Sequence, residues 1–522
     1  MKEEFYESFC QRQPVTVDCV GHTHIDVAWL WTLAQTREKA IRSFATVNYL
    51  MDRYPEYKFL SSQPQLYDFV RKDCPALFEK IRARVADGHW EPEGGMWLES
   101  DCNMASGESL IRQFLHGQEF FGREFGKQGH ILWLPDAFGF SGALPQIMAQ
   151  CGMDWFMTTK MAWNDTNCMP HDLTRWRGID GTEVLAYFIS TKDYDKRLDR
   201  NPKPSFNTTY NGLLNPRQVM GCWQRFQDKE LTQDVLQCYG YGDGGGGPTA
   251  EMLETARRLE YGLPGIPKTQ MSFAGDFLNR VESNFIKNCE VTKRTPKWVG
   301  ELYLEFHRGT YTSIAKNKKN NRDCEFLCQT AETAALSDML LCGGAYPQDA
   351  LHDAWETLLL NQFHDIIPGS SIFEVYEESD REYAQVRSTI GDAKSNAINS
   401  IAKSADKKGL LVYNPNSFAA SGIVKYDGGY TYAENVPSMG WKVIEPSVTE
   451  NTVTVSDKCI DSKHYTIKFD YCMNIVSLFD KDCGREVIKD GQTANRMQLF
   501  EDYPRQYDNW ELTDYYQEKM QT

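Results

Sequence analysis

The first part of the chain alternates short apolar runs with longer segments of helical periodicity. The apolar runs predict strands at 15–20, 58–62, 90–95, 130–136, 155–159 and 184–189. The periodic segments predict helices at 33–50 and beginning near 65, 75 and 106. The run at 130–136 is apolar throughout its middle, which is typical of a strand buried on both faces. Strand–helix alternation of this kind predicts an α/β domain with a parallel sheet or a barrel-like arrangement.

The periodicity becomes helical from about residue 324 and changes to strand-like alternation after Gly409. Apolar stripes predict three helices, at 326–341, 351–359 and 372–402, and consecutive helices with short loops favour a bundle. Alternating segments at 410–415 and 464–470 predict the start of an all-β sandwich domain. We therefore divide the chain into an α/β domain over 1–280, a three-helix bundle over 281–405 and an incomplete β domain over 406–522.

Composition and charge narrow the class of protein. The 522 residues carry a net charge of −16, which disfavours nucleic acid and anionic membrane surfaces as partners. No apolar stretch is long enough for a transmembrane helix, and the acidic N-terminus lacks the apolar core of a secretory signal. The 15 cysteines form no C-x-x-C pair, which favours reduced thiols and a cytoplasmic location.

Polar residues stand where predicted strands end, which is where parallel α/β folds bind ligands. His22, His24 and Asp26 alternate and so share one face of a strand. Imidazole and carboxylate suit a borderline divalent ion, with zinc as the default, but a polar strand end with hydrogen-bonded histidines explains the pattern equally well. Asp136 closes the apolar run at 130–136, where a carboxylate is either ligated or paired, or caps the next turn.

Two later positions are also candidates. His364 and Asp365 follow the second helical stripe, although a histidine at a helix end is more often a capping or packed residue. Asp243 lies in the glycine loop 240–248, where it serves as a turn residue or faces a closely approaching ligand. That loop contains a G-x-G-x-x-G pattern but no clear β-branched strand before it and no Lys-Ser/Thr after it, so we do not expect it to bind a nucleotide.

Five motifs together carry a family resemblance. In chain order they are His22–Trp31, Trp133–Ser141, Tyr241–Thr249, Gly300–Thr312 and Asn361–Gly369. Their sequences and order resemble those of the class II α-mannosidases of glycoside hydrolase family 38, in its cytosolic and bacterial branch. Five long motifs in the same order are far more specific than any one of them.

The resemblance implies a role for each candidate residue. It implies a zinc ion, with cobalt as the second candidate, bound by His24, Asp26, Asp136 and His364. Asp136 would also be the nucleophile, and Asp243 would be the acid/base. Trp29 and Phe138 would line the sugar subsite, and Asp365 would bind a sugar hydroxyl.

The implied activity is that of a retaining α-mannosidase, with 1–280 as its catalytic domain. It would release terminal α-linked mannose from oligosaccharides or glycans through a covalent mannosyl-enzyme intermediate. Such enzymes use two carboxyls about 5–5.5 Å apart, one as nucleophile and one as acid and then base. A metal ion beside Asp136 would keep that carboxylate ionised.

Two other functions remain open at this point. One is a metal-dependent hydrolase of the amidohydrolase or deacetylase type, although the strand ends offer Asp136 rather than further histidine or lysine ligands. A metallo-β-lactamase-like motif would need histidine where Val27 stands. The other is a catalytically incomplete sugar-binding fragment, because family members normally continue into a large C-terminal β region.

The position of Thr522 inside a β-domain pattern leads to expectations about partners. We expect either a further polypeptide that supplies the rest of the β region or a homo-oligomer. We also expect an exposed strand edge near the C-terminus, with a tendency to aggregate.

Overall fold

The computed structural model describes residues 15–164, 166–199, 207–405, 407–447, 452–503, 507 and 509–521. It divides into two compact units. The first comprises Met1–Cys328, Gln348–Gly391 and Asp508–Glu511, and the second comprises Gln329–Pro347, Asp392–Tyr507 and Leu512–Thr522. The division at 280 and 405 expected from the sequence stays a prediction.

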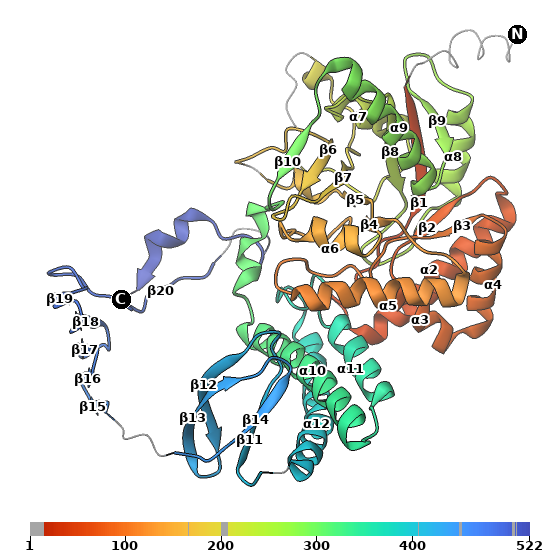
Figure 1. The fold of residues 1–522 in the computed structure, drawn as a ribbon. Coiled ribbons are helices and arrows are strands. Elements are labelled where there is room, and N and C mark those ends of the chain that lie inside the picture. Colours follow the sequence, from red (N-terminus) through yellow and green to blue (C-terminus); the bar gives the residue numbers. More distant parts are fainter. Residues whose placement is uncertain are drawn as a thin grey trace, which may run out of the picture. The chain divides into compact units, whose positions relative to one another are not determined.

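The first sheet of the first unit is parallel and centred on the N-terminal strand. Its strands are β1 (Thr16–His22), β2 (Phe59–Ser61), β3 (Trp90–Pro92), β8 (Asp234–Tyr239) and β9 (Lys268–Met271). Their order is β3-β2-β1-β8, and β9 also pairs with β1. All of these pairs are parallel, as the strand–helix alternation predicts. The helices α2 (Leu33–Arg53), α3 (Pro64–Asp73), α4 (Pro75–Ala86) and α5 (Gly107–Phe125) gather beside β1–β3 (Figure 1).

The second sheet is mixed. Its strands are β4 (Ile131–Trp133), β5 (Trp155–Thr158), β6 (Leu173–Arg177), β7 (Glu183–Phe188) and β10 (Lys297–Val299), in the order β10-β6-β7-β5-β4. β6 and β7 are antiparallel, because the short connection from Arg177 to Glu183 permits only a hairpin. The barrel-like arrangement is not confirmed: within the described residues, no strand pair joins the two sheets.

A buried aromatic core holds the end of β4. Phe156 lies with its ring centroid 4.7 Å from that of Phe140 and 4.9 Å from that of Trp176. Leu134 and Ala137, which flank the end of this strand, belong to the same apolar cluster. Tilted aromatic pairs of this kind contribute about 0.5–1.5 kcal/mol each beyond their buried area. The polar residue between them, Asp136, is therefore presented from a tightly packed support.

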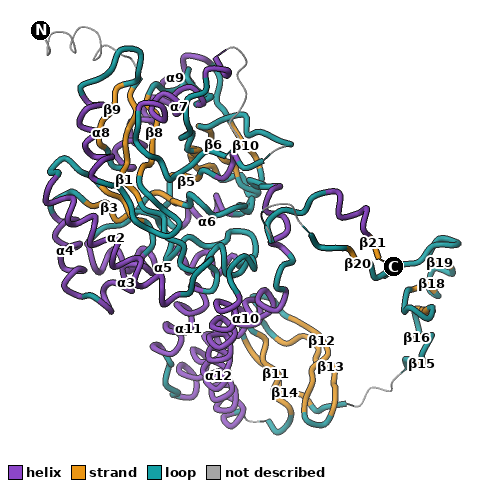
Figure 2. The backbone as a smooth tube through the Cα atoms, turned by 180° about the vertical axis from the view of Figure 1, so that it is seen from behind, coloured by secondary structure: helices purple, strands orange, loops and turns teal. Residues whose placement is uncertain are grey.

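The α/β part contains four further helices, which the sequence analysis did not predict. They are α6 (Leu144–Gln150), α7 (Pro216–Arg225), α8 (Ala250–Glu260) and α9 (Ala274–Thr292). The predicted helical segments become α10 (Ala315–Cys342), α11 (Gln348–Leu360) and α12 (Phe373–Ser404), which are drawn in purple in Figure 2. Lys316 and Asn320 of α10 bind Asp380 of α12. The helical middle region expected from the sequence is confirmed.

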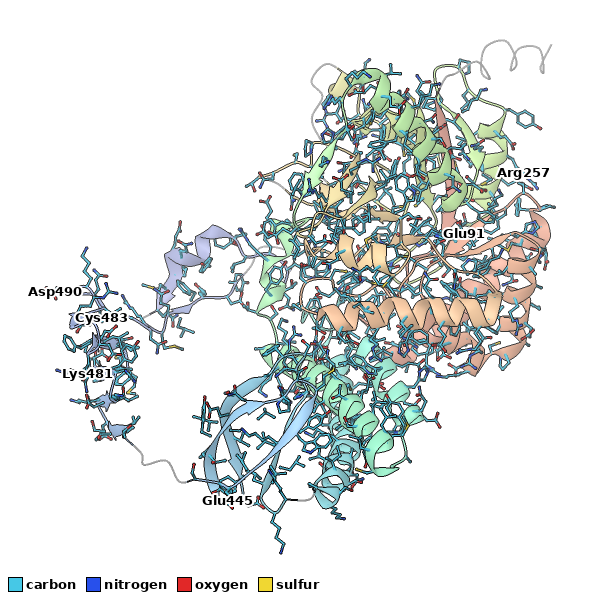
Figure 3. The ribbon with its side chains drawn as sticks, in the orientation of Figure 1. Glu91, Arg257, Glu445, Lys481, Cys483 and Asp490 are labelled. Carbon is cyan, nitrogen blue, oxygen red and sulfur yellow. The ribbon has the colours of Figure 1, made fainter. Side chains whose placement is uncertain are left out.

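Glu91 connects β3 to α9 within the first unit, and Figure 3 labels its side chain. Its carboxyl oxygens accept hydrogen bonds from the backbone N–H groups of Ala274 (2.8 Å) and Gly275 (3.0 Å), at the first turn of α9. A carboxylate is favourable at the positive end of a helix dipole. Burial nevertheless raises the pKa of Glu91 to about 8.

The second unit contains the predicted β-rich region. β11 (Leu410–Asn414) pairs with β14 (Gly440–Ile444), and β12 (Ala420–Tyr426) pairs with β13 (Gly429–Val436). A five-stranded meander follows, made of β15 (Thr454–Ser456), β16 (Cys459–Asp461), β17 (Tyr465–Phe469), β18 (Ile475–Asp480) and β19 (Arg485–Glu486). β20 (Leu499–Phe500) pairs with β21 (Met520–Gln521). β15 is an edge strand, and all of its residues are exposed. The packing of these strands into a sandwich and a tendency to aggregate stay predictions.

Short 3-10 helices complete the described structure. They are η1 (Lys160–Ala162), η2 (Lys196–Asp199), η3 (Glu305–Tyr311) and η4 (Asp514–Lys519). Among the described residues, none of the helices combines the length and the apolar character that crossing a bilayer requires.

Candidate metal centre and active site

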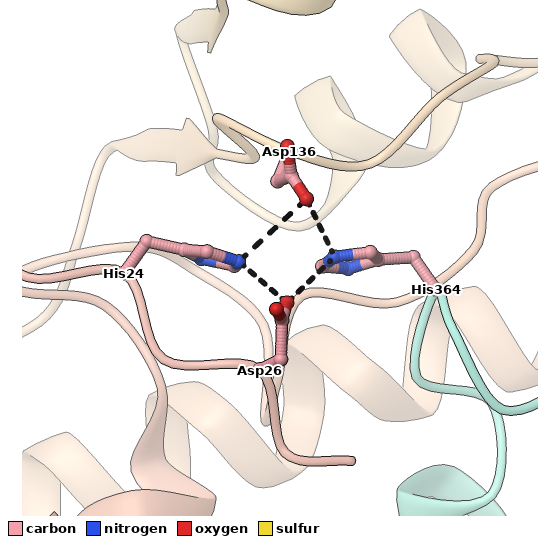
Figure 4. Close-up of side chains that lie close together, drawn as sticks. All are labelled: His24, Asp26, Asp136 and His364. Atoms are coloured by element: carbon pink, nitrogen blue, oxygen red, sulfur yellow. Dashed lines mark hydrogen bonds and ion pairs between the residues drawn. The ribbon is translucent and has the colours of Figure 1, made fainter. Parts of the chain in front are cut away.

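Four buried side chains converge from three distant parts of the chain (Figure 4). His24 and Asp26 follow β1, Asp136 follows β4, and His364 lies in the loop between α11 and α12. One ligand atom from each lies within 4.8 Å of the others. The structure therefore brings together all four residues for which a metal-binding role was predicted.

The distances between donor atoms suit one small ion. Nε2 of His24 lies 2.8 Å from Oδ1 of Asp26 and 3.9 Å from Oδ2 of Asp136. Nε2 of His364 lies 3.5 Å and 3.6 Å from the same two oxygens. Ligand atoms of a tetrahedral zinc site are separated by about 3.3 Å, given metal–ligand distances near 2.0–2.1 Å. Two imidazoles and two carboxylates are also the ligand types that a borderline divalent ion prefers.

The electrostatics of the cluster favour a positive charge at its centre. Burial lowers the pKa of His364, but Asp136 and Asp26 outweigh it and raise that pKa to about 10. Burial also opposes the charged form of His24, whose pKa Glu99 and Asp26 nevertheless raise well above its usual value. Nε2 of His364 is buried without a hydrogen bond in the part of the chain described. A divalent cation would supply the positive charge and leave both imidazoles neutral as ligands.

Glu99 orients both histidines and was not predicted. Its carboxylate Oε2 lies 2.8 Å from Nδ1 of His24, and its backbone carbonyl accepts a hydrogen bond from Nδ1 of His364 at 2.6 Å. Ser62 Oγ donates to the other carboxylate oxygen at 2.9 Å. Nδ1 of His24 lies beside the Glu99 carboxylate and Nδ1 of His364 is hydrogen-bonded, so both Nε2 atoms face the centre. Histidines in metal sites are often held in this way by outer carboxylates and carbonyls. Glu99 lies outside the five motifs, and no spacing distinguishes it.

Lys160 is a second residue that the sequence did not indicate. Its buried Nζ, in η1, lies 2.6 Å from Oδ1 of Asp136, the oxygen that faces away from the histidines. Burial raises the pKa of Asp136, but Lys160, His364 and His24 outweigh it and hold that pKa well below its usual range. Asp136 is therefore ionised even before a metal ion is considered.

Asp243 lies in the loop that follows β8, with its backbone in the left-handed region at φ 56°. Its Oδ1 accepts hydrogen bonds from Tyr210 (2.7 Å) and Asn211 (3.0 Å), and its carbonyl accepts one from the N–H of Asp26 (2.9 Å). Burial, followed by Asp136 and Asp26, raises the pKa of Asp243. The pKa of Asp243 is thus raised, whereas that of Asp136 is lowered.

A strand does precede this glycine loop, although it is not the β-branched strand that a nucleotide-binding pattern requires. β8 ends at Tyr239, directly before Gly240. The strand lacks the β-branched run that the pattern requires, since its sequence is DVLQCY. Its strand conformation comes from pairing with β1 along its whole length.

His22 does not join the cluster, although alternation along the strand placed it on the same face. Its Nε2 accepts a hydrogen bond from Trp133 Nε1 at 3.1 Å. Burial and His24 lower the pKa of His22 to about 3, so the ring is neutral. β1 ends at His22, and the period of two does not continue into the loop that carries His24 and Asp26.

The residues predicted to contact sugar lie beside the cluster. The ring of Phe138 is 5.9 Å from that of His364 and nearly perpendicular to it. Asp365 Oδ2 lies 3.8 Å from Nε2 of His364, and burial and Asp26 raise the pKa of Asp365 to about 7. Trp29 is half-buried, and its carbonyl accepts a hydrogen bond from the N–H of Ile372 at 2.8 Å.

Two further aromatic side chains, Trp510 and His307, pack against Trp29 and Phe138, and we call these four residues the aromatic wall. Trp510 stacks on Trp29, with ring centroids 5.9 Å apart and planes 10° apart. His307 stacks on Phe138 at 4.4 Å and 10°, and Trp510 lies 5.1 Å from His307. His307 belongs to a recognised motif without an assigned role, whereas Trp510 comes from a part of the chain where only strands were expected.

Comparisons with known proteins point to one family. The model of the glycosyl hydrolases family 38 N-terminal domain matches residues 14–301, and that of the alpha mannosidase middle domain matches residues 305–401. The chain is 36% identical to alpha-mannosidase 2C1 of Homo sapiens over 96% of its own length and 48% of the relative. It is 32% identical to alpha-mannosidase G of Dictyostelium discoideum over 98% of its length and 50% of the relative. The chain thus spans about half the length of these curated relatives.

A solved structure shares the fold. The crystal structure of an alpha-mannosidase from Enterococcus faecalis V583 superposes with a TM-score of 0.72, covering 90% of this chain and 61% of that one. At 15% sequence identity, this similarity concerns the fold alone.

Proposed function

This chain belongs to glycosyl hydrolase family 38, and we propose that it carries the catalytic centre of a retaining, metal-dependent α-mannosidase. The substrate would be terminal α-linked mannose in oligosaccharides or glycans. The observation that carries the proposal is the buried cluster of two histidines and two carboxylates, beside which the pKa of Asp243 is raised while that of Asp136, within the cluster, is lowered.

His24, Asp26, Asp136 and His364 would hold the ion, with zinc as the first candidate and cobalt as the second. When bound, the ion supplies positive charge beside Asp136 and a Lewis-acidic contact for neighbouring hydroxyls of mannose, whose O2 is axial and O3 equatorial. Glu99 would keep both histidines aimed at the ion.

Asp136 and Asp243 divide the covalent chemistry between them. Asp136 would attack the anomeric carbon with its ionised carboxylate, while Lys160 holds one of its oxygens in place. Asp243 would give its proton to the departing glycosidic oxygen and then take a proton from the water that releases the sugar. The raised pKa of Asp243 suits the first of these steps, and Tyr210 and Asn211 fix its orientation.

The sugar would rest against the aromatic wall beside the cluster. We assign Trp29 and Phe138 to its apolar C–H face and Asp365 to one of its hydroxyls. The stacking of Trp510 on Trp29 supports a role for Trp510 as a further wall of the same subsite.

The decisive experiment measures release of 4-nitrophenol from 4-nitrophenyl α-mannoside by the chelator-treated chain, before and after zinc or cobalt is added. We expect turnover only with metal, none after Asp136→Asn, and little on the matching α-glucoside or β-mannoside. Turnover that survives the chelator or the substitution would contradict the proposal.

Several coarser expectations stay predictions alongside this function. They are the catalytic domain at 1–280, barrel-like closure of its sheets, a cytoplasmic location, and assembly with a further C-terminal polypeptide or as a homo-oligomer. Sedimentation of the purified chain across a concentration range tests the last of them.

A further inference from the structure

A second cluster of histidine and carboxylate side chains lies on two helices of the first unit, apart from the residues assigned above. It consists of His116 on α5 and His352 and Glu356 on α11, with one ligand atom of each within 4.8 Å of the others. We propose that this cluster binds a zinc-class divalent ion that clamps α11 to α5. The proposal does not depend on the mannosidase activity.

Helical spacing brings together two of the three ligands. His352 and Glu356 are four residues apart, so their side chains share one face of α11. Nε2 of His352 lies 3.2 Å from Oε1 of Glu356, which is close to the separation of about 3.3 Å between two ligands of a tetrahedral zinc ion. The pair can therefore chelate an ion with little rearrangement.

His116 completes the site from the neighbouring helix. Its ring centroid lies 5.0 Å from that of His352, and the two planes differ by 15°. In the first cluster, His24 and His364 have centroids 5.5 Å apart and planes that differ by 23°. The two histidine pairs therefore have nearly the same relative geometry, although helices present one pair and loops present the other.

The His116 ring has no other polar role in the described structure. Its residue is only 7% exposed, and no hydrogen bond to either ring nitrogen is found among the described residues. Its ring contacts are with His352 and with Trp97, whose centroid lies 6.3 Å away. A ring nitrogen without a hydrogen-bond partner is available as a ligand to an ion.

The cluster is accessible and chemically selective. The side chains of His352 and Glu356 are 39% and 25% exposed, so an ion can enter from solvent and keep a water molecule as a further ligand. Two imidazoles favour zinc, nickel, cobalt or copper over the oxygen-seeking calcium and magnesium.

The location explains what a clamp would achieve. α11 ends at Leu360, directly before the loop that carries His364. Gln113, one turn before His116 on α5, already donates a hydrogen bond to the carbonyl of Leu359 at 3.1 Å. An ion between His116 and His352 would add a second tie between the same two helices and so hold the loop of the first cluster in place.

The test counts zinc bound after equilibrium dialysis, by elemental analysis, in the unaltered chain and in His352→Gln and Glu356→Gln. Each substitution should lower the zinc content by about one equivalent, since loss of one of three ligands removes most of the affinity. His130→Gln, which removes a histidine whose side chain is 69% exposed, should leave the content unchanged. Because the readout is a difference, it is independent of how much metal the first cluster binds.

A zinc content that is the same in all variants and in the unaltered chain would overturn the proposal. If the substitutions prevent folding, as judged by circular dichroism, crystals of the unaltered chain soaked in zinc decide the matter. An anomalous peak between His116 and His352 supports the clamp, and its absence rejects it. A peak at the first cluster alone would leave the proposed function standing without the second site.

Discussion

The two histidine–carboxylate clusters resemble each other in the geometry of their rings and differ in almost everything around them. The first draws its ligands from the ends of β1 and β4 and from a loop far along the chain, and all four are buried. The second uses the faces of two adjacent helices, and two of its three ligands are half-exposed. The first also has Lys160, Glu99 and Asp243 around it, whereas the second has no comparable set of charged groups assigned to chemistry.

On our proposals, the first site carries out a reaction and the second holds two helices together. A nucleophile and an acid must keep opposite protonation states close to each other, which burial and neighbouring charges make possible. Strand ends and loops can deliver such groups from distant positions. A helix delivers ligands only at fixed spacing on its own face, which is sufficient to hold an ion but not to build a pocket for a sugar.

The largest expected effect comes from Asp136, which we propose to be both metal ligand and nucleophile. Asp136→Asn should lower kcat on 4-nitrophenyl α-mannoside by about 10⁴-fold or more, because groups that form the covalent intermediate have effects of this size. Steady-state kinetics at saturating zinc provide the measurement. Asp180→Asn, at an exposed position, is the matched control and should retain full activity. A loss of less than tenfold would remove Asp136 from the role of nucleophile.

Asp243→Asn should have the next largest effect, and its size should depend on the leaving group. We expect a loss of about 10²–10⁴-fold on 4-nitrophenyl α-mannoside, because proton donation is lost. The loss should be smaller on the 2,4-dinitrophenyl substrate, whose leaving group needs no proton, and azide should restore turnover as the α-mannosyl azide. Equal losses on both substrates without azide rescue would point to a structural role.

The same variant has a signature in its pH profile. Because the pKa of Asp243 is raised, the unaltered protein keeps the acid protonated above the usual carboxyl range. Its kcat/KM should fall as pH rises through that raised pKa, since the acid is then deprotonated. In Asp243→Asn, the fall of kcat/KM at high pH should flatten. An unchanged fall would show that another group causes it.

Glu99→Gln should weaken metal binding while leaving the reacting carboxyls in place. Loss of an outer carboxylate that orients a ligand histidine costs about 10–100-fold in affinity, which competition with a chromophoric chelator measures. Activity at saturating zinc should recover more fully than in Asp136→Asn. Glu119→Gln, at a side chain that is 58% exposed, should bind metal normally.

The smallest effect is expected at the second cluster. His352→Gln should remove part of the rise in Tm that zinc produces, by about 2–4 °C per kcal/mol of lost binding linkage. Differential scanning calorimetry with and without zinc measures the rise. The rise should persist in His130→Gln, and a full rise in His352→Gln would leave only the first cluster as a source of stabilisation.

Much of the first cluster could be predicted because its residues lie in local patterns. His24 and Asp26 belong to one short motif after an apolar strand, Asp136 ends another strand, and His364 follows a helical stripe. The helices of the middle region were also well predicted, since the segment at 351–359 lies inside α11 and the segment at 372–402 starts one residue before α12 and ends within it. Apolar periodicity and polar strand ends are properties of neighbouring residues, and they can be recognised without knowledge of the fold.

Other features depended on contacts between distant segments. The division of the strands between two sheets was not predicted, and β8 is a strand because it pairs with β1. Glu99 and Lys160 matter only through the atoms they meet, and His22 is excluded because β1 stops at that residue.

By itself, the sequence determined the residue types of the candidate site, many of the helices and strands, and the family. Only the tertiary structure decided which side chains share one centre, which protons they hold, and that His116 on α5 meets His352 on α11. The physical reason is that periodicity encodes structure over a few residues. Distances between remote side chains, and the pKa values that depend on them, are set by how whole elements pack.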